Sequence, residues 1–104
     1  FYRECHRVLD TGGIMVQQSE SPLVHQRLIT DMSAAMQRAG FVATDLLSFP
    51  QPCYPTGWWS ATLARADTRE LYQPAADPSF ETFYYTADIH RGAFALPAFM
   101  KPLR

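Results

Sequence analysis

The sequence predicts an α/β fold whose chain ends in an antiparallel pair of strands. Three observations indicate this class. A short apolar segment at residues 13–16 follows a Gly-Gly turn, as is typical of a buried strand. Residues 22–39 carry apolar side chains every three or four positions, which is the pattern of an amphipathic helix. Two further apolar runs, residues 41–49 and 58–66, are separated by a loop too short for a parallel crossover.

The first element expected is a helix over residues 1–9, which ends at the turn Asp10-Thr11-Gly12-Gly13. The chain begins with Phe1 inside this helix, and it shows no leader of charged and then apolar residues. We therefore expect residues 1–104 to be a fragment or a processed product of a longer protein.

The segment over residues 13–22 is the most informative part of the chain. A strand is expected over residues 13–18, and its apolar start predicts neighbours on both faces. Ser21 is placed to cap the next helix, which has a proline in its first turn. Because ligands bind outside the carboxyl ends of strands in open α/β sheets, Gln18 and Glu20 are expected at a small-molecule site.

The remaining elements are expected in the following order. The helix over residues 22–39 ends at Gly40, and the strand over residues 41–49 leads into a rigid, proline-rich loop at residues 50–57. The rest comprises a strand at residues 58–66, a polar excursion at residues 67–79, a helix at residues 87–94 and a turn or two around residues 97–100. This order is that of the tail half of an α/β domain.

Composition excludes several classes of function. The 104 residues form one domain at most, with 47% hydrophobic residues, 18% charged residues and a formal net charge of -1. No basic excess is available for nucleic acid or an anionic membrane, and no apolar run approaches the roughly 18 residues of a membrane span. We expect no nucleic-acid or membrane partner. Three strands make a thin core with one unpaired edge, so we expect a homo-oligomer.

The cysteines and histidines predict neither a disulfide nor a metal site. Cys5 and Cys53 lack a CxxC spacing, and we interpret them as reduced thiols of a cytoplasmic protein. His6, His25 and His90 lack the spacing of metal ligands. We expect no metal and no cofactor, with His6 and His25 on helix surfaces.

Three blocks of sequence stand in a distinctive order. They are residues 12–22 (GGIMVQQSESP), residues 52–59 (PCYPTGWW) and residues 84–97 (YYTADIHRGAFALP). Together they resemble the C-terminal part of the spermidine synthases, the polyamine aminopropyltransferases. Local departures are Cys53 for the usual Thr, Thr56 for the usual Ser, and Leu23 where many members have Trp. Each block alone is a weak signal, whereas three in order are a strong one.

The resemblance implies the C-terminal half of a seven-stranded, methyltransferase-like (Rossmann-like) sheet. It also implies transfer of an aminopropyl group from decarboxylated S-adenosylmethionine, a co-substrate, to putrescine or a similar diamine, which gives spermidine and methylthioadenosine. The family's nucleotide-binding strands and catalytic aspartate lie upstream of the matching blocks. The chain alone is therefore expected to be inactive.

Four residues are the candidates for the site. The resemblance implies that Tyr54 is catalytic, positioning or deprotonating the attacking amine, and that Gln18 lies beside the diamine and accepts a hydrogen bond from it. Trp59 is expected to line a slot for the methylene chain or to contact an ammonium group. Glu20 is expected to attract the cationic diamine, although it could equally stabilise the N-terminus of the following helix.

Two other interpretations remain open at this point. The chain could be a non-enzymatic half-domain that persists by oligomerising through its unpaired strand edge. It could also be the remnant of a methyltransferase of the same fold, although methyl transfer needs no diamine slot. We interpret Asp88, His90 and Arg91 as structural residues that fix the closing helix, and Trp58 as a packing residue.

Overall fold

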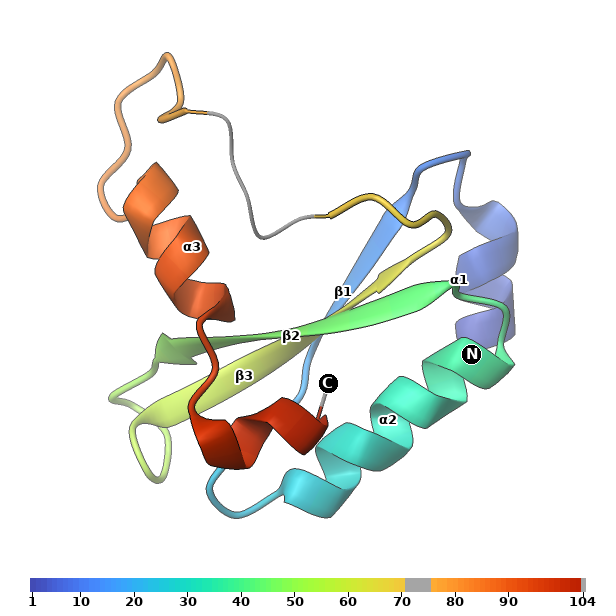
Figure 1. Cartoon of the computed structure of the whole chain (residues 1–104), viewed down its shortest axis with the longest axis horizontal. Coiled ribbons are helices and arrows are strands. Elements are labelled where there is room, and N and C mark those ends of the chain that lie inside the picture. The colour runs from blue at the N-terminus through green and yellow to red at the C-terminus, as the bar shows by residue number, and fades with distance from the viewer. Residues whose placement is uncertain (71–75, 104) are drawn as a thin grey trace.

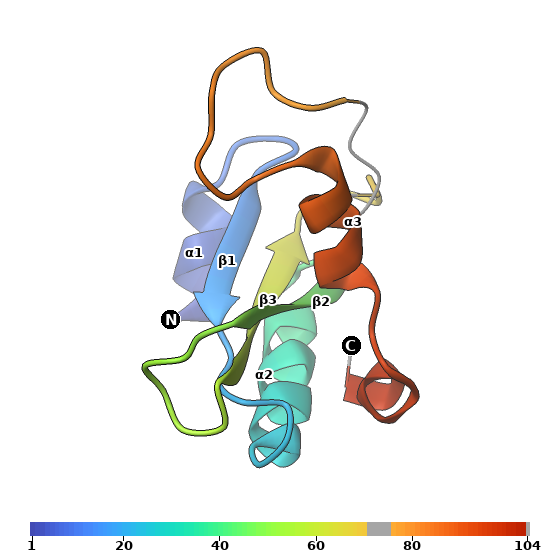
Figure 2. The same ribbon diagram turned by 90° about the vertical axis from the view of Figure 1, so that its left-hand side faces the viewer.

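The computed structural model describes residues 1–70 and 76–103. Its elements are α1 (Tyr2–Val8), β1 (Ile14–Gln18), α2 (Gln26–Arg38), β2 (Ala43–Pro50), β3 (Trp58–Arg65), α3 (Ala87–Phe94) and the 3-10 helix η1 (Ala98–Leu103). The three strands form one sheet, with α2 on one side and α3 on the other (Figures 1 and 2). Part of the excursion expected over residues 67–79 lies outside the described residues.

Strand β3 occupies the centre of the sheet. The strand order is β1-β3-β2, and β3 pairs antiparallel with both neighbours. The register runs from Ile14 opposite Arg65 on one edge and from Pro50 opposite Trp58 on the other. The antiparallel pair expected from the short loop at residues 50–57 is confirmed. β1 and β2 run parallel to each other, but β3 separates them.

The main core lies between α2 and the sheet. One cluster of buried side chains joins α2, β2 and η1, with Trp58 packed against it; its members are Ile29, Leu46, Met100 and Leu103. A second cluster joins α2 to the other end of β3 and includes Met36, Phe41 and Ala64. Side chains of α1 and β1 cover the second cluster, among them Tyr2, Cys5 and Met15. The interpretation of Trp58 as a packing residue is confirmed.

The expectation that β1 is buried on both faces is wrong. Ile14 and Val16 are 37% and 60% exposed, and they alternate with partly buried residues along the strand. The cause is the position of α3, which packs on β2, at the opposite edge of the sheet (Figure 2). The apolar side chains of β1 on this face therefore have no helix over them in the described part of the chain.

The start of the long helix also differs from the expectation. α2 begins at Gln26 rather than at residue 22, and its N-cap is His25, which makes no side-chain capping bond. Residues 22–24 form a turn instead, in which the His25 N–H donates to the Ser21 carbonyl at 2.9 Å. The Ser21 hydroxyl accepts from the Leu23 N–H at 3.3 Å, so Ser21 shapes this turn and does not cap α2.

The closing helix has the bounds that the sequence predicts. α3 covers residues 87–94, and the Thr86 hydroxyl caps it by accepting from the Ile89 N–H at 3.0 Å. Asp88 and Arg91 form an ion pair at 2.6 Å within α3. The Tyr85 hydroxyl lies 2.9 Å from His90 Nδ1 and joins the helix to the segment before it. These contacts agree with a structural role for the closing block.

A buried ion pair joins the two strands of the hairpin. Arg65 Nη2 lies 2.9 Å from Asp45 Oδ2, and the two side chains are 8% and 17% exposed. The two charges are close but lack the alignment of a hydrogen bond, and Arg65 Nε and Nη1 have no hydrogen-bond partner among the described residues. Because a buried charge without a partner is expensive, this pair makes the hairpin sensitive to loss of either member.

Replacing Asp45 by alanine should lower the free energy of unfolding by about 3–5 kcal/mol, because it leaves the Arg65 guanidinium buried without its counter-charge. Asp31→Ala is the matched control, since it removes the exposed Arg27–Asp31 pair, whose atoms are 3.7 Å apart. That change should stay within about 1 kcal/mol. Urea denaturation monitored by circular dichroism measures both, and equal effects would contradict the importance of burial at Asp45.

Candidate functional site

The proline-rich loop between β2 and β3 is closed by its own backbone hydrogen bonds. The Gln51 N–H donates to the Gly57 carbonyl at 2.9 Å, and Tyr54 and Gly57 are joined by an N–H to carbonyl bond of 3.0 Å. Thr56 and Gly57 both have positive φ, 72° and 65°. Positive φ is uncommon for a residue other than glycine, so the Thr56 backbone is held there by its surroundings. The loop therefore presents Tyr54 from a fixed backbone.

A pair of hydroxyl groups, one buried and one exposed, joins this loop to the turn between β1 and α2. The Ser21 hydroxyl lies 2.8 Å from the Thr56 hydroxyl, and Ser21 is fully buried. Thr56 Oγ1 also lies 3.1 Å from the Trp58 carbonyl. Two segments that are 35 residues apart in the sequence are thus fixed side by side.

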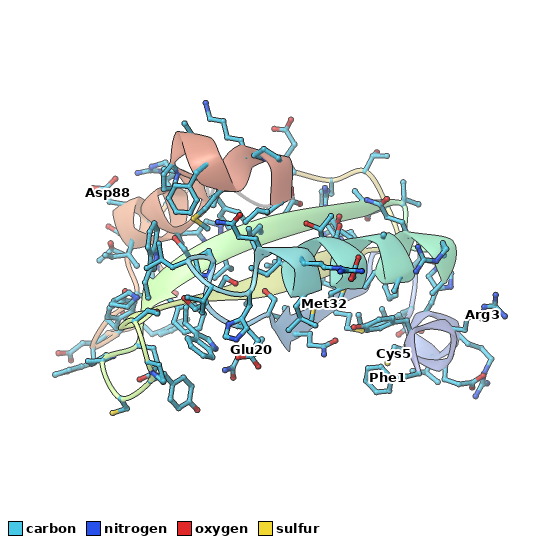
Figure 3. All side chains as sticks on the ribbon, turned by 90° about the horizontal axis from the view of Figure 1, so that it is seen from below. Phe1, Arg3, Cys5, Glu20, Met32 and Asp88 are labelled. Carbon is cyan, nitrogen blue, oxygen red and sulfur yellow. The ribbon has the colours of Figure 1, made fainter. Side chains whose placement is uncertain are left out.

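Glu20 lies just beyond the end of β1 and has an unusual backbone. Its φ is 69°, and its carbonyl accepts from both the N–H and the hydroxyl of Ser60, at 2.9 and 2.8 Å. Its neighbour Ser19 pairs with the same residue through both backbone and side chain. In Figure 3 the Glu20 side chain projects from the side of the molecule opposite α3, which carries Asp88. The backbone of Glu20 is fixed, whereas its carboxylate is partly exposed.

Three aromatic rings meet at the start of β3. The rings of Tyr54 and Trp59 have centroids 4.9 Å apart at 59°, and the His25 ring lies 6.3 Å from that of Trp59 at 69°. Trp59 is 6% exposed, whereas Tyr54 is 44% exposed. Two of the four predicted residues are therefore in contact, one of them buried and the other exposed.

His25 was missed as a member of this group. The expectation that His6 and His25 lie on helix surfaces is wrong for both, because both are partly buried and make edge-on ring contacts. His25 contacts Trp59, and His6 contacts Phe41. The sequence held one signal for His25, namely its place in the same short connection after β1 as Glu20.

Gln18 lies at the last position of β1 and is exposed. It stands opposite Ala61, which places it on the same face as Trp59, as a diagonal neighbour at ~7–8 Å. No hydrogen bond joins Gln18 to Tyr54 within the described ranges. Gln17 points to the other face, where burial raises the pKa of the Tyr2 phenol and a hydrogen bond with the Gln17 side chain partly offsets that rise. The two adjacent glutamines thus have different surroundings.

An apolar cleft of about 760 Å³ lies elsewhere, between α3 and the sheet. Its walls include Val16 and Leu63 from the sheet and Ile89 and Phe94 from α3. None of the four predicted residues lines this cleft. We therefore place the candidate site at the Tyr54–Trp59 contact rather than in this cleft.

The described part of the chain contains neither a cluster of metal ligands nor a membrane-spanning helix. No group of three or more His, Cys, Asp or Glu side chains there could hold a metal ion, and Cys5 and Cys53 are both free thiols. None of the helices described is long and apolar enough to cross a membrane.

The fold and the motifs define a class that comparison with known proteins identifies. Residues 1–73 match the spermine/spermidine synthase domain, and the chain belongs to this family. It is 55% identical over 101 residues to the polyamine aminopropyltransferase of Methylococcus capsulatus, which covers 95% of the chain and 35% of that relative. It is 49% identical over 104 residues to the polyamine aminopropyltransferase of Stenotrophomonas maltophilia, which covers 97% of the chain and 37% of that relative.

A solved structure shares the fold. The crystal structure of spermidine synthase from Thermotoga maritima superposes with a TM-score of 0.80 at 23% identity, over 98% of this chain and 36% of that one. The α/β class and the likeness to the spermidine synthase fold are confirmed. The chain spans about a third of the length of the relatives that it matches.

The Ser21–Thr56 link should prove important for the order of the Tyr54 loop. Ser21→Ala removes the hydrogen bonds of the Ser21 hydroxyl to Thr56 and to the Leu23 N–H, and should lower the free energy of unfolding by about 1 kcal/mol. Limited proteolysis should also cut residues 51–57 faster. Thr30→Ala, which removes an exposed bond to the Gln26 carbonyl, is the control and should leave the loop unchanged. Equal cleavage rates in the two variants would refute the link.

Proposed function

We propose that this chain is the C-terminal part of a polyamine aminopropyltransferase. The complete enzyme would transfer an aminopropyl group from decarboxylated S-adenosylmethionine to putrescine, which gives spermidine and methylthioadenosine. Family membership supports the reaction class. The observation that carries the assignment to particular residues is the Tyr54–Trp59 contact, 4.9 Å between centroids, beside the end of β1.

The chemistry makes two demands on such a site. A diamine is almost fully protonated at neutral pH, with pKa values of about 10.4, and only a neutral amine can attack. The amine nitrogen forms a bond to the carbon beside the sulfonium, the carbon–sulfur bond breaks, and its electron pair leaves on a neutral thioether. The site must therefore accept a proton from one amine and align nitrogen, carbon and sulfur.

In this proposal Tyr54 acts on the attacking amine. The residue is exposed while its ring contacts that of Trp59, and the closed loop holds its backbone. A phenolic oxygen can accept a hydrogen bond from the amine and orient its lone pair toward the donor carbon. The general base that removes the proton would belong to a part of the enzyme outside these residues.

The other candidates would bind the diamine. The Trp59 ring would form an apolar wall for the methylene chain, or a cation–π partner for an ammonium group. The Gln18 carbonyl oxygen would accept a hydrogen bond from an amine, and the partly exposed Glu20 carboxylate would attract the cationic substrate. The exposure of Gln18 and its place on the same face as Trp59 support this arrangement.

The remainder of the enzyme would complete both fold and site. We infer a seven-stranded sheet in which further strands extend beyond β1, together with the binding site for the donor. The isolated chain would then be inactive, and the enzyme would be a cytoplasmic homo-oligomer. The exposed apolar side chains of β1, Ile14 and Val16, support the covering of this face in the complete protein.

Tyr54→Phe in the full-length enzyme should lower kcat/KM for putrescine by ~100-fold, because the variant loses the hydroxyl that orients the amine while keeping the ring contact with Trp59. Methylthioadenosine release measures the rate. Tyr84→Phe, at an exposed tyrosine of the apolar cleft, is the control and should retain activity. Full activity of Tyr54→Phe would sink the assigned role.

The two adjacent glutamines provide a second test. Gln18→Ala should raise KM for the diamine by ~10-fold, since a hydrogen bond to a charged or reacting amine is lost. Gln17→Ala, on the face toward Tyr2, should leave that KM unchanged. Steady-state kinetics with putrescine varied at saturating donor distinguishes them. If Gln17→Ala had the larger effect on KM, the diamine would lie on the other face of β1.

A further inference from the structure

We propose that His25 is a positioning residue that holds the indole ring of Trp59 in the orientation that the diamine meets, a role that rests on the proposed function. None of the three blocks that indicate the family includes His25. Its contact with Trp59 connects it to the candidate site.

The backbone of His25 is fixed from two directions. Its N–H donates to the Ser21 carbonyl at 2.9 Å, and its carbonyl accepts from the Ile29 N–H at 3.1 Å, in the first turn of α2. Its side chain makes no capping bond to α2. The imidazole instead contacts β3, where it meets the Trp59 ring edge-on with the ring centroids 6.3 Å apart.

One ring nitrogen of His25 and the indole nitrogen of Trp59 are buried polar atoms. Trp59 Nε1 and His25 Nδ1 are both buried, and neither has a hydrogen-bond partner among residues 1–70 and 76–103. An indole N–H can only donate, whereas Nδ1 of a neutral imidazole can accept. Buried polar groups of folded proteins are normally satisfied, directly or through ordered water. One water molecule that accepts from Trp59 and donates to His25 would satisfy both rings.

The orientation of Trp59 affects the part of the site that would bind the diamine. The same indole ring contacts the ring of Tyr54, so a rotation of Trp59 would displace both the wall of the diamine slot and the Tyr54 side chain. His25 acts through Trp59 and touches neither substrate in this proposal. Its loss should therefore change KM for the diamine and leave KM for the sulfonium donor unchanged.

The test uses the full-length protein and three variants. His25→Phe keeps an aromatic edge but removes Nδ1, His25→Asn places an amide near the position of Nδ1, and His6→Asn removes a comparable ring contact, with Phe41, away from the site. We expect His25→Phe to raise KM for putrescine about 10-fold with the donor KM unchanged, His25→Asn to stay within about 3-fold of the parent, and His6→Asn to have no effect.

A spectroscopic readout separates this proposal from the proposed function. The indole ¹H–¹⁵N resonance of Trp59, identified by its loss in Trp59→Phe, should shift in His25→Phe and return toward the parent position in His25→Asn. An unchanged resonance and an unchanged putrescine KM in His25→Phe would overturn the proposal, as would equal changes in KM for both substrates. A parent protein without aminopropyl transfer would refute the proposed function, while the resonance would still report whether His25 holds Trp59.

Discussion

The central position of β3 is the constraint on which the rest of the structure depends. It is hydrogen-bonded on both edges, and its residues from Trp59 to Arg65 are all buried. Because side chains alternate along a strand, each residue of β3 is committed to one of two surroundings. Trp58 packs into the core beneath α2. Its neighbour Trp59 therefore points to the opposite face, where it contacts Tyr54. The core and the candidate site are consequences of the same register.

Much of the fold follows from local sequence signals. The proline-rich loop required an antiparallel hairpin, and the short helix at residues 87–94 has the expected bounds because Thr86 supplies a cap at its start. The exposure of β1 could not be predicted in this way, since it depends on which edge of the sheet α3 covers. The start of α2 was also missed, because the Ser21 hydroxyl serves Leu23 and Thr56 rather than the end of the helix.

Some contacts of the candidate site also follow from local sequence, whereas others depend on tertiary packing. The contact between Tyr54 and Trp59 could be anticipated, because a five-residue separation across a rigid loop keeps the two rings close. The approach of His25 to Trp59 could not, because it requires the turn at residues 22–24 and the pairing of β1 with β3 to act together. Periodicity assigns a histidine before a helix to the surface, whereas tertiary packing places this one against an indole ring.

The register of β3 therefore determines both the packing of the core and the residues at the candidate site. A slip of β3 by one residue would exchange the two tryptophans, burying Trp59 beneath α2 and presenting Trp58 at the site. The hydroxyl pair between Ser19 and Ser60, at 3.0 Å, opposes such a slip because a displaced Ser60 would lose both this bond and its bond to the Glu20 carbonyl. Glu20 has a left-handed, strained backbone just after the end of β1, where the chain enters the site. The hydrogen bonds of Ser60 maintain this conformation.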